Sequence, residues 1–249
     1  MSSTKQQLSE KERAARDVFE RLAAEADRFE GYARPHAARV AAIADALAEA
    51  FGLGREDRAN LRIAALAHDL GELAMERDYI KRSGPLNDEE RLDLARHPVI
   101  GEQEAARSGA DRGAQLLVRW HHEWWDGAGY PDALRGEQIP LPARILRAAD
   151  SYAALTDDRP FRRALTEEAA RRHIAEWAGL EFDPRVARAL LSLRDLPGLR
   201  SYARGHDGAG ETEERARETA EADGEVDREV ARAEVDRDGG RAEVDRWVI

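Results

Sequence analysis

The sequence predicts an all-α fold. Apolar residues recur at three- and four-residue spacing in most segments before residue 200, a pattern typical of helices that bury one face. Capping residues, glycines and prolines separate these segments. Hydrophobic residues make up 42% of the chain, which suffices for a core, although 36% of the residues are charged.

The first predicted helix covers residues 9–30. Its apolar stripe consists of Val18, Phe19, Leu22, Ala26 and Phe29. Ser9 and Glu12 have the spacing of a capping box, so we expect the helix to start at Ser9. Gly31 and Pro35 interrupt the pattern, and a second helix starts at His36 on or beside an apolar stripe.

The third predicted helix covers residues 55–68 and is almost continuously apolar near its end, so we expect it to be buried. His68 and Asp69 lie at that end, immediately before Leu70 and Gly71. A buried His-Asp pair is costly without partners. Two interpretations are open: the pair binds a metal ion, or it forms a structural hydrogen bond.

Residues 78–87 are predicted to form a loop, and Asn87 or Asp88 to cap a helix that ends at His97. Pro98 favours that end, because the residue before proline is disfavoured in a helix. Further helices are expected at about 98–108, 111–121, 142–156, 166–178 and 183–194. His173 lies among arginines, and we expect it to be exposed and without a role.

The most distinctive segment is 120–131, WHHEWWDGAGYP. On a regular helix His121 and His122 would point about 100° apart. Both can therefore face one site only if that site is wide, as for more than one metal ion, or if the helix ends there. The adjacent Trp124 and Trp125 either line the site or pack in the ordinary way. Asp150 is a second candidate ligand, because it lies in an otherwise apolar helical stretch.

Composition excludes several classes of protein. The chain has no cysteine, so any metal must be bound by His, Asp or Glu. It has neither a leader peptide nor an apolar run long enough to span a bilayer, which favours a cytoplasmic protein that does not contact a membrane. Clustered positive charge is also missing, so a nucleic acid polymer is not an expected partner.

The C-terminal region differs in character. Fifteen acidic residues and seven arginines lie between Asp207 and Arg246, a net charge of −8 out of −11 for the chain. The sequence RAEVDR occurs at 232–237 and again at 241–246. Such a segment buries little apolar surface, so we expect an acidic low-complexity tail at 200–249.

Taken together, these motifs resemble the HD-GYP family of HD-domain phosphohydrolases. The resemblance covers about residues 30–195 and rests on HDLGE at 68–72, HP at 97–98, HHEWWDGAGYP at 121–131, AD at 149–150 and RPF at 159–161. It implies an HD-domain helical bundle with a metal site in its core. The domain would span 31–199, with residues 1–30 as a helix packing on the bundle.

The resemblance also implies the roles of individual residues. The implied metal ligands, for two divalent ions that are usually iron or manganese, are His36, His68, Asp69, His97, His121, His122 and Asp150. Asp69 would bridge the two ions and take part in catalysis. Tyr130, Arg159 and Arg162 would contact the substrate. Imidazole and carboxylate ligands suit these metals, which would activate a shared water as hydroxide for attack on phosphorus.

Two positions depart from the family pattern. Tyr32 occupies the position where the family commonly has a glutamate for a third metal, which favours two metals here. Glu72 replaces the lysine of the family's HDxGK motif. Glu72 is a general acid or base, an additional metal ligand, or the mark of a site that has lost diesterase activity.

The expected function is therefore hydrolysis of cyclic di-GMP or a related nucleotide phosphoester by a metal-bridged hydroxide. Two alternatives remain open. One is a non-catalytic HD-GYP adaptor or sensor, and the other is a phosphohydrolase that uses Glu72 on a different phosphate ester. The resemblance adds a nucleotide substrate and a regulatory protein partner to the expected partners.

Overall fold

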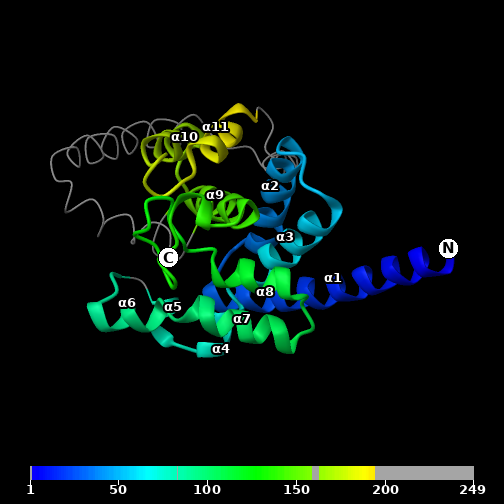
Figure 1. Cartoon of the computed structure of the whole chain (residues 1–249). Coiled ribbons are helices and arrows are strands. Elements are labelled where there is room, and N and C mark those ends of the chain that lie inside the picture. Colours follow the sequence, from blue (N-terminus) through cyan, green and yellow to red (C-terminus); the bar gives the residue numbers. More distant parts are fainter. Residues whose placement is uncertain (1, 83, 159–162, 194–249) are drawn as a thin grey trace, which may run out of the picture. The chain divides into compact units, whose positions relative to one another are not determined.

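The computed structural model describes residues 2–82, 84–158 and 163–193, with side chains from residue 13 onward. These residues form helices and no β-strand, which confirms the predicted all-α class (Figure 1). The helices are α1 (Ser2–Glu30), α2 (His36–Ala50), α3 (Arg55–Ala67), α4 (Leu70–Met75), α5 (Asp78–Lys81), α6 (Asp88–Leu94), α7 (His97–Arg107), α8 (Arg112–Arg119), α9 (Leu141–Leu155), α10 (Glu167–Glu176) and α11 (Pro184–Ser192).

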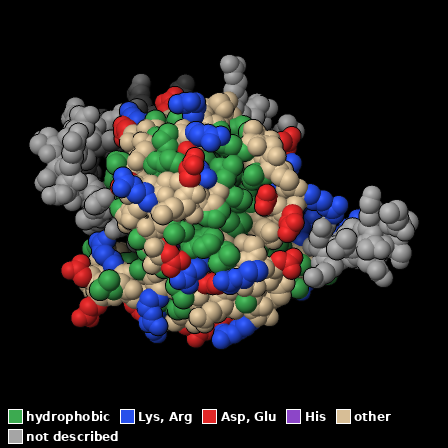
Figure 2. Space-filling model, in the orientation of Figure 1, with side chains coloured by type: hydrophobic (Ala, Val, Ile, Leu, Met, Phe, Trp, Pro, Cys, Tyr) green, Lys and Arg blue, Asp and Glu red, His purple; other side chains and the backbone are tan. Residues whose placement is uncertain are grey.

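The chain divides into two compact units, Met1–Gly198 and Leu199–Ile249. All described residues belong to the first unit, so the predicted acidic tail lies outside the description. Among the described residues, no helix is long and apolar enough to cross a membrane. On the face shown in Figure 2, basic and acidic side chains are interspersed rather than gathered by sign.

Helix α9 is the centre of the first unit. It packs against α2, α3, α8, α10 and α11 (Figure 1), and nearly all of its residues after the first turn are buried. Pro142 lies in the first turn, where its missing N–H costs no hydrogen bond. A helix buried on all sides is mostly apolar, so the polar residues that α9 does carry are strong candidates for function.

Two predicted helix boundaries were wrong. Helix α1 starts at Ser2 rather than Ser9, so Ser9 and Glu12 lie inside the helix and not at its start. Helix α6 ends at Leu94, and His97 is the first residue of α7 instead of the last residue of α6. The physical reason is that proline is well suited to the first turn of a helix. The predicted loop at 78–87 also contains the short helix α5.

Gly71 allows α4 to pack directly on α7. A Cβ atom at this position would lie 2.0 Å from the carbonyl oxygen of His97 and 2.9 Å from the backbone nitrogen of Gly101. Both are backbone atoms, which cannot move without displacing a helix. The contact fixes the start of α7, and with it His97, against the turn that carries His68 and Asp69.

We predict that Gly71→Ala lowers the free energy of unfolding by about 3 kcal/mol or more, because the new methyl group overlaps backbone. The measurement is urea denaturation, with Gly54→Ala as the control. A Cβ atom at Gly54 meets no atom within 4 Å, and Gly54 is the N-cap of α3, so that change should cost about 1 kcal/mol or less. Equal midpoints for the two variants would contradict the proposed close packing.

Candidate metal centre

The seven predicted metal ligands are buried, and most of them lie at helix ends. His36 and His97 are the first residues of α2 and α7. His68 and Asp69 form the junction between α3 and α4. His121 and His122 follow the C-cap of α8, so the helix ends before them, and both side chains can face one site. Asp150, by contrast, lies in the interior of a helix, α9.

The structure brings these side chains together. Three overlapping groups have their ligand atoms within 4.8 Å of one another: His97, His121 and His122; His36, His68 and Asp69; and Asp69, Glu72 and His97. Asp150 joins them, because its Oδ1 lies 3.3 Å from Nε2 of His36 and 3.5 Å from Nε2 of His68. These groups are candidate metal-binding clusters, and the role of each residue as a ligand stays a prediction.

Three of the histidines are oriented in the same way. Nδ1 of His68, His97 and His121 lies 2.9, 2.9 and 2.6 Å from the backbone carbonyl oxygen of the residue three positions earlier. A carbonyl oxygen only accepts, so Nδ1 carries a proton in all three rings. Burial lowers the pKa of His97 and His121, so Nε2 of these two rings has a bare lone pair. Nε2 of His68 lies 2.8 Å from Oδ2 of Asp69, and although burial opposes it, Asp69 and Asp150 raise the pKa of His68 well above its usual value, so a cation at Nε2 would replace a proton. A backbone carbonyl on the far nitrogen is the usual support of a metal-binding histidine.

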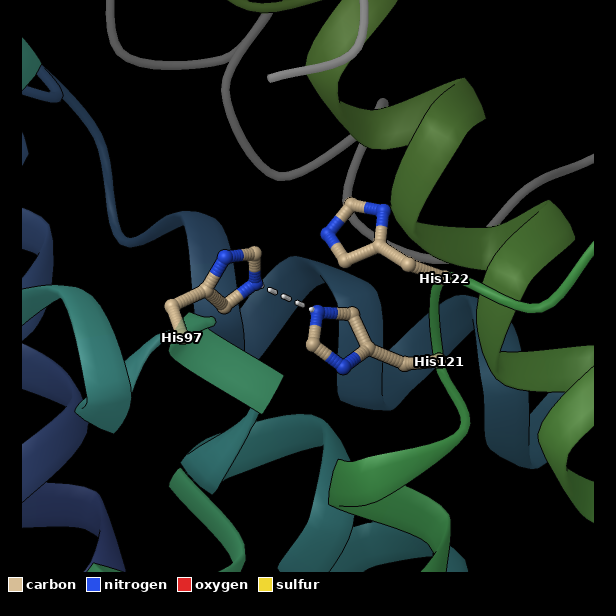
Figure 3. Close-up of side chains that lie close together, drawn as sticks. All are labelled: His97, His121 and His122. Atoms are coloured by element: carbon tan, nitrogen blue, oxygen red, sulfur yellow. Dashed lines mark hydrogen bonds between the residues drawn. The ribbon is translucent and has the colours of Figure 1, made fainter. Parts of the chain in front are cut away.

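The distance between the facing nitrogens of His97 and His121 indicates whether these residues could bind a cation. Their Nε2 atoms are 3.2 Å apart, and Figure 3 shows them pointing at each other. Two lone pairs at this distance repel unless a proton or a cation lies near both. Burial lowers the pKa of His97, and burial with the neighbouring His97 and His68 lowers the pKa of His121 to about 3. A proton is therefore disfavoured, and a metal ion fits the donor set.

The carboxylates add to the same argument. Burial opposes ionisation of Asp69, but the adjacent His68 outweighs it and lowers the pKa of Asp69 to about 2. In Glu72, burial together with Glu30 and Asp69 raises the pKa well above its usual value. Buried carboxylates this close to one another need cationic charge to be stable when ionised.

Glu72 lies inside the cluster rather than at its edge. Its side chain is buried, its Oε1 is 3.9 Å from Nδ1 of His97, and it groups with Asp69 and His97. The lysine expected at this position would bring a positive charge to the site. A carboxylate here favours the metal-ligand interpretation over a direct contact with a substrate phosphate, which it would repel.

Asp157 is a candidate site residue that the sequence interpretation missed. Its Oδ2 lies 3.3 Å from Nδ1 of His36, and its Oδ1 accepts from Arg39 at 2.5 Å. Arg39 is also hydrogen-bonded to Thr156 and to the carbonyl of Ala153. Asp157 therefore directs Nε2 of His36 toward Asp150. Asp157 follows Asp150 by seven residues, which is about two helical turns, and this spacing in the sequence already indicated that both could lie on the same side of the helix.

The loop that carries Tyr130 is fixed by buried and ionic contacts. Glu123 accepts hydrogen bonds from the backbone nitrogens of Asp132 (2.7 Å) and Leu134 (2.9 Å). Asp132 in turn accepts from Arg119 at 2.7 Å and from Nε1 of Trp120 at 2.8 Å. These contacts hold the loop against the end of α8, where the two adjacent histidines lie.

Gly129 lets this loop fold back on itself. A Cβ atom there would lie 2.4 Å from the carbonyl oxygen of His122 and 2.2 Å from the backbone nitrogen of Trp124. The backbone nitrogen of Tyr130 donates to the same carbonyl at 3.1 Å. The ring of Tyr130 then stacks on His122, with centroids 4.9 Å apart and planes 12° apart. Tyr130 is partly exposed, so it can meet a ligand.

Other predicted residues are placed differently. Trp124 is buried and packs edge-on against Trp177, which is ordinary packing rather than the wall of the site. The prediction that His173 is exposed was wrong, because it is partly buried and stacks on Trp177 with centroids 5.8 Å apart. Arg159 and Arg162 lie outside the described residues.

Comparison with known proteins identifies the family. The profile of the HD domain matches residues 3–186, so this chain belongs to the HD domain family. It is 37% identical over 189 residues to the cyclic di-GMP phosphodiesterase response regulator RpfG of Xanthomonas campestris, covering 74% of this chain and 49% of that protein. The family expected from the motifs is thereby confirmed.

Two further relatives differ in the substrate that their names state. A cyclic di-GMP phosphodiesterase of Pseudomonas aeruginosa is 38% identical over 165 residues, which cover 64% of this chain and 39% of that protein. A 3'3'-cGAMP-specific phosphodiesterase of Vibrio cholerae is 31% identical over 158 residues, which cover 63% and 30%. The chain thus spans at most about half the length of these relatives.

Solved structures support the fold. A cyclic GMP-AMP specific phosphodiesterase of Vibrio cholerae superposes with a TM-score of 0.56 at 17% identity, covering 70% of this chain and 47% of that one. An HDG"Y"P protein from Bdellovibrio bacteriovorus superposes with a TM-score of 0.52 at 19% identity, covering 63% and 50%. At these identities the likeness concerns the fold alone.

We predict that Asp157→Asn weakens metal binding by roughly 10- to 100-fold. An asparagine whose oxygen stays on Arg39 turns its NH2 toward His36, which favours a proton on Nε2 where the metal should bind. The measurement is a zinc titration against a competing chelator. Asp45→Asn is the control, because Asp45 also pairs with arginines but contacts Arg58 and Arg62 on α3. An unchanged affinity in Asp157→Asn would remove Asp157 from the metal centre.

We also predict a pH-dependent contribution of Asp132 to stability. Hydrogen bonds from Arg119 and Trp120 lower the pKa of Asp132 from 3.8 to about 2. A lowered pKa stabilises the folded state fully above the unfolded value, and this contribution disappears as the pH falls toward the folded value. Melting temperatures of wild type and Asp132→Asn should therefore differ at neutral pH and converge below about pH 4. A difference in melting temperature that stays constant across this pH range would refute the contribution of the ionised Asp132 side chain to stability.

Proposed function

We propose that this protein is a metal-dependent phosphodiesterase that hydrolyses a cyclic dinucleotide. The observation that supports it most strongly is the pair of facing lone pairs on His97 and His121. A buried cation would remove the repulsion between them. The relatives whose names state phosphodiesterase activity supply the reaction class. The chain covers only part of those relatives, so the activity is a proposal for this protein.

The proposed centre holds two divalent ions, with iron or manganese suited to a mixed imidazole and carboxylate ligand set. Asp69 would be the bridging ligand: Asp69 and His97 each belong to two of the three ligand groups, and of these two only the carboxylate has two oxygens with which to bind two ions. When bound, the two ions lower the pKa of a water molecule and neutralise charge on the phosphoryl group. The chain supplies the orientation: Nδ1 of each supported histidine is held by a carbonyl or a carboxylate, so its Nε2 faces inward.

Substrate binding is proposed to involve Tyr130, Arg159 and Arg162. Tyr130 is stacked on His122 at the edge of the centre and is partly exposed, which suits a ring that packs on a base or ribose. Arginines are well suited to phosphate oxygens, since a guanidinium donates two parallel hydrogen bonds. The names of the relatives include both cyclic di-GMP and 3'3'-cGAMP, so both are candidate substrates.

Glu72 favours a second possibility, hydrolysis of a different phosphate ester. Its carboxylate stands where the family motif has a lysine, and it lies beside Asp69 and His97. If Glu72 binds a metal, it changes the charge of the centre without contacting the substrate. If it moves a proton during catalysis, its substitution should abolish turnover while the metal stays bound.

The test is hydrolysis by protein loaded with manganese or iron, using cyclic di-GMP, 3'3'-cGAMP and a linear dinucleotide as substrates. We expect turnover of at least one cyclic dinucleotide, and a loss of at least about 1000-fold in His68→Ala, Asp69→Ala and chelator-treated protein. Absence of turnover in protein shown to carry metal would contradict the proposed function and favour an adaptor or sensor.

Glu72→Lys separates the two candidate substrate classes. If the native substrate is a cyclic dinucleotide and Glu72 is a metal ligand, this variant should lose metal and activity together. If instead Glu72→Lys creates activity on cyclic di-GMP that the wild type lacks, the native substrate is another phosphate ester. Glu72→Gln with full metal content and no turnover would assign a proton-transfer role to Glu72.

A further inference from the structure

In four of the five clustered histidines, Nδ1 lies against an oxygen that can only accept a hydrogen bond. For His68, His97 and His121 this group is a backbone carbonyl oxygen, and for His36 it is the carboxylate of Asp157. In each of these rings the proton belongs on Nδ1. Nε2 is then the atom available to a metal ion.

His122 is supported in the opposite way. Its Nδ1 lies 2.7 Å from Nη1 of Arg147, and a guanidinium has only donors. Nδ1 must therefore accept, and the single proton of the neutral ring belongs on Nε2. Figure 3 shows one ring nitrogen of His122 turned toward His97 and His121 and the other turned away from them. The protonated nitrogen is the one that faces the centre.

Arg147 is held firmly in this position. Its Nη2 lies 2.8 Å from Oε1 of Glu181, which also accepts from Ser151 at 3.0 Å. Arg147 and Glu181 are almost completely buried, and Arg147 lies one helical turn before Asp150, with Nη1 3.8 Å from Oδ2 of Asp150. A buried ion pair of this kind is costly to break, because one charge would be left without a partner.

We propose that His122 is not a metal ligand but an N–H donor, which Arg147 orients toward a phosphoryl oxygen of the substrate. Coordination through Nε2 would require either loss of the ring's last proton or separation of His122 from the buried guanidinium, and both are costly. The remaining proposed ligands are His36, His68, Asp69, His97, His121 and Asp150, with Glu72 as a further candidate. This assignment rests on the proposed function for its substrate, but its tautomer can be measured independently.

The direct measurement is long-range 1H–15N correlation NMR of protein labelled with 15N-histidine and loaded with zinc, which is diamagnetic. The 15N shifts distinguish a protonated nitrogen from a bare or metal-bound one. We expect metal-bound Nε2 and protonated Nδ1 in His36, His68, His97 and His121, and the reverse proton position with no bound metal in His122. A metal-bound Nε2 in His122 would overturn the proposal, whether or not the protein hydrolyses any nucleotide.

A matched pair of adjacent substitutions gives a second test. His122→Gln keeps an N–H donor and should leave zinc stoichiometry and affinity within about twofold of wild type, because a residue that is not a ligand contributes little to them. His121→Gln removes a ligand and should lower affinity by at least about 100-fold. Equal losses in the two variants would show that His122 binds the metal.

Arg147→Met tests the role of the guanidinium, combined with Glu181→Gln so that no unpaired carboxylate remains buried. We expect the His122 proton to become free to move to Nδ1, with a changed 15N spectrum for this ring alone. Arg144→Met is the control, because Arg144 lies one turn earlier on α9 and pairs with Asp183 at 2.6 Å. A His122 spectrum that does not change in the Arg147 variant would exclude Arg147 as the positioning residue.

Discussion

One contact at the centre would be repulsive without a cation. His97 and His121 present unprotonated nitrogens to each other at 3.2 Å, and each ring is held there by a backbone carbonyl of its own helix or turn. Neither ring can turn away without leaving that carbonyl unsatisfied. The fold thus holds several lone pairs and carboxylates close together. A bound metal would stabilise this cluster, and without the metal the cluster lowers the stability of the folded protein.

The arrangement of the helices explains how these side chains come together. Helices α2, α3, α4, α7 and α8 begin or end at or beside the candidate ligands, so the ends of several helices meet at the cluster that Asp150 of α9 joins. Gly71 permits the closest of these approaches, and the turn through Gly129 brings Tyr130 onto the same group of rings. Packing between helices, rather than any single loop, sets the distances between the ligands.

Two residues of or beside α9 act on neighbouring rings in opposite ways. Asp157 accepts from Nδ1 of His36 and thereby directs Nε2 of His36 toward Asp150, whereas Arg147 donates to His122 and leaves the proton on Nε2 of that ring. The same side-chain type can therefore serve as a ligand or as a donor, depending on the charge placed behind it. A sequence motif shows only that a histidine is present, so it cannot distinguish a histidine that binds a metal from one that donates a hydrogen bond.

The sequence by itself determined the helical class, most helix positions and the set of histidines and acids at the centre. These follow from local periodicity and from residue types that are costly to bury alone, both of which act over a few neighbouring positions. Only the tertiary structure decided that His97 begins a helix, that His173 packs on Trp177, and that Arg147 and Asp157 lie behind His122 and His36. The physical reason is that a ring's proton position depends on partners 25 and 121 residues away in the chain, which local pattern cannot encode.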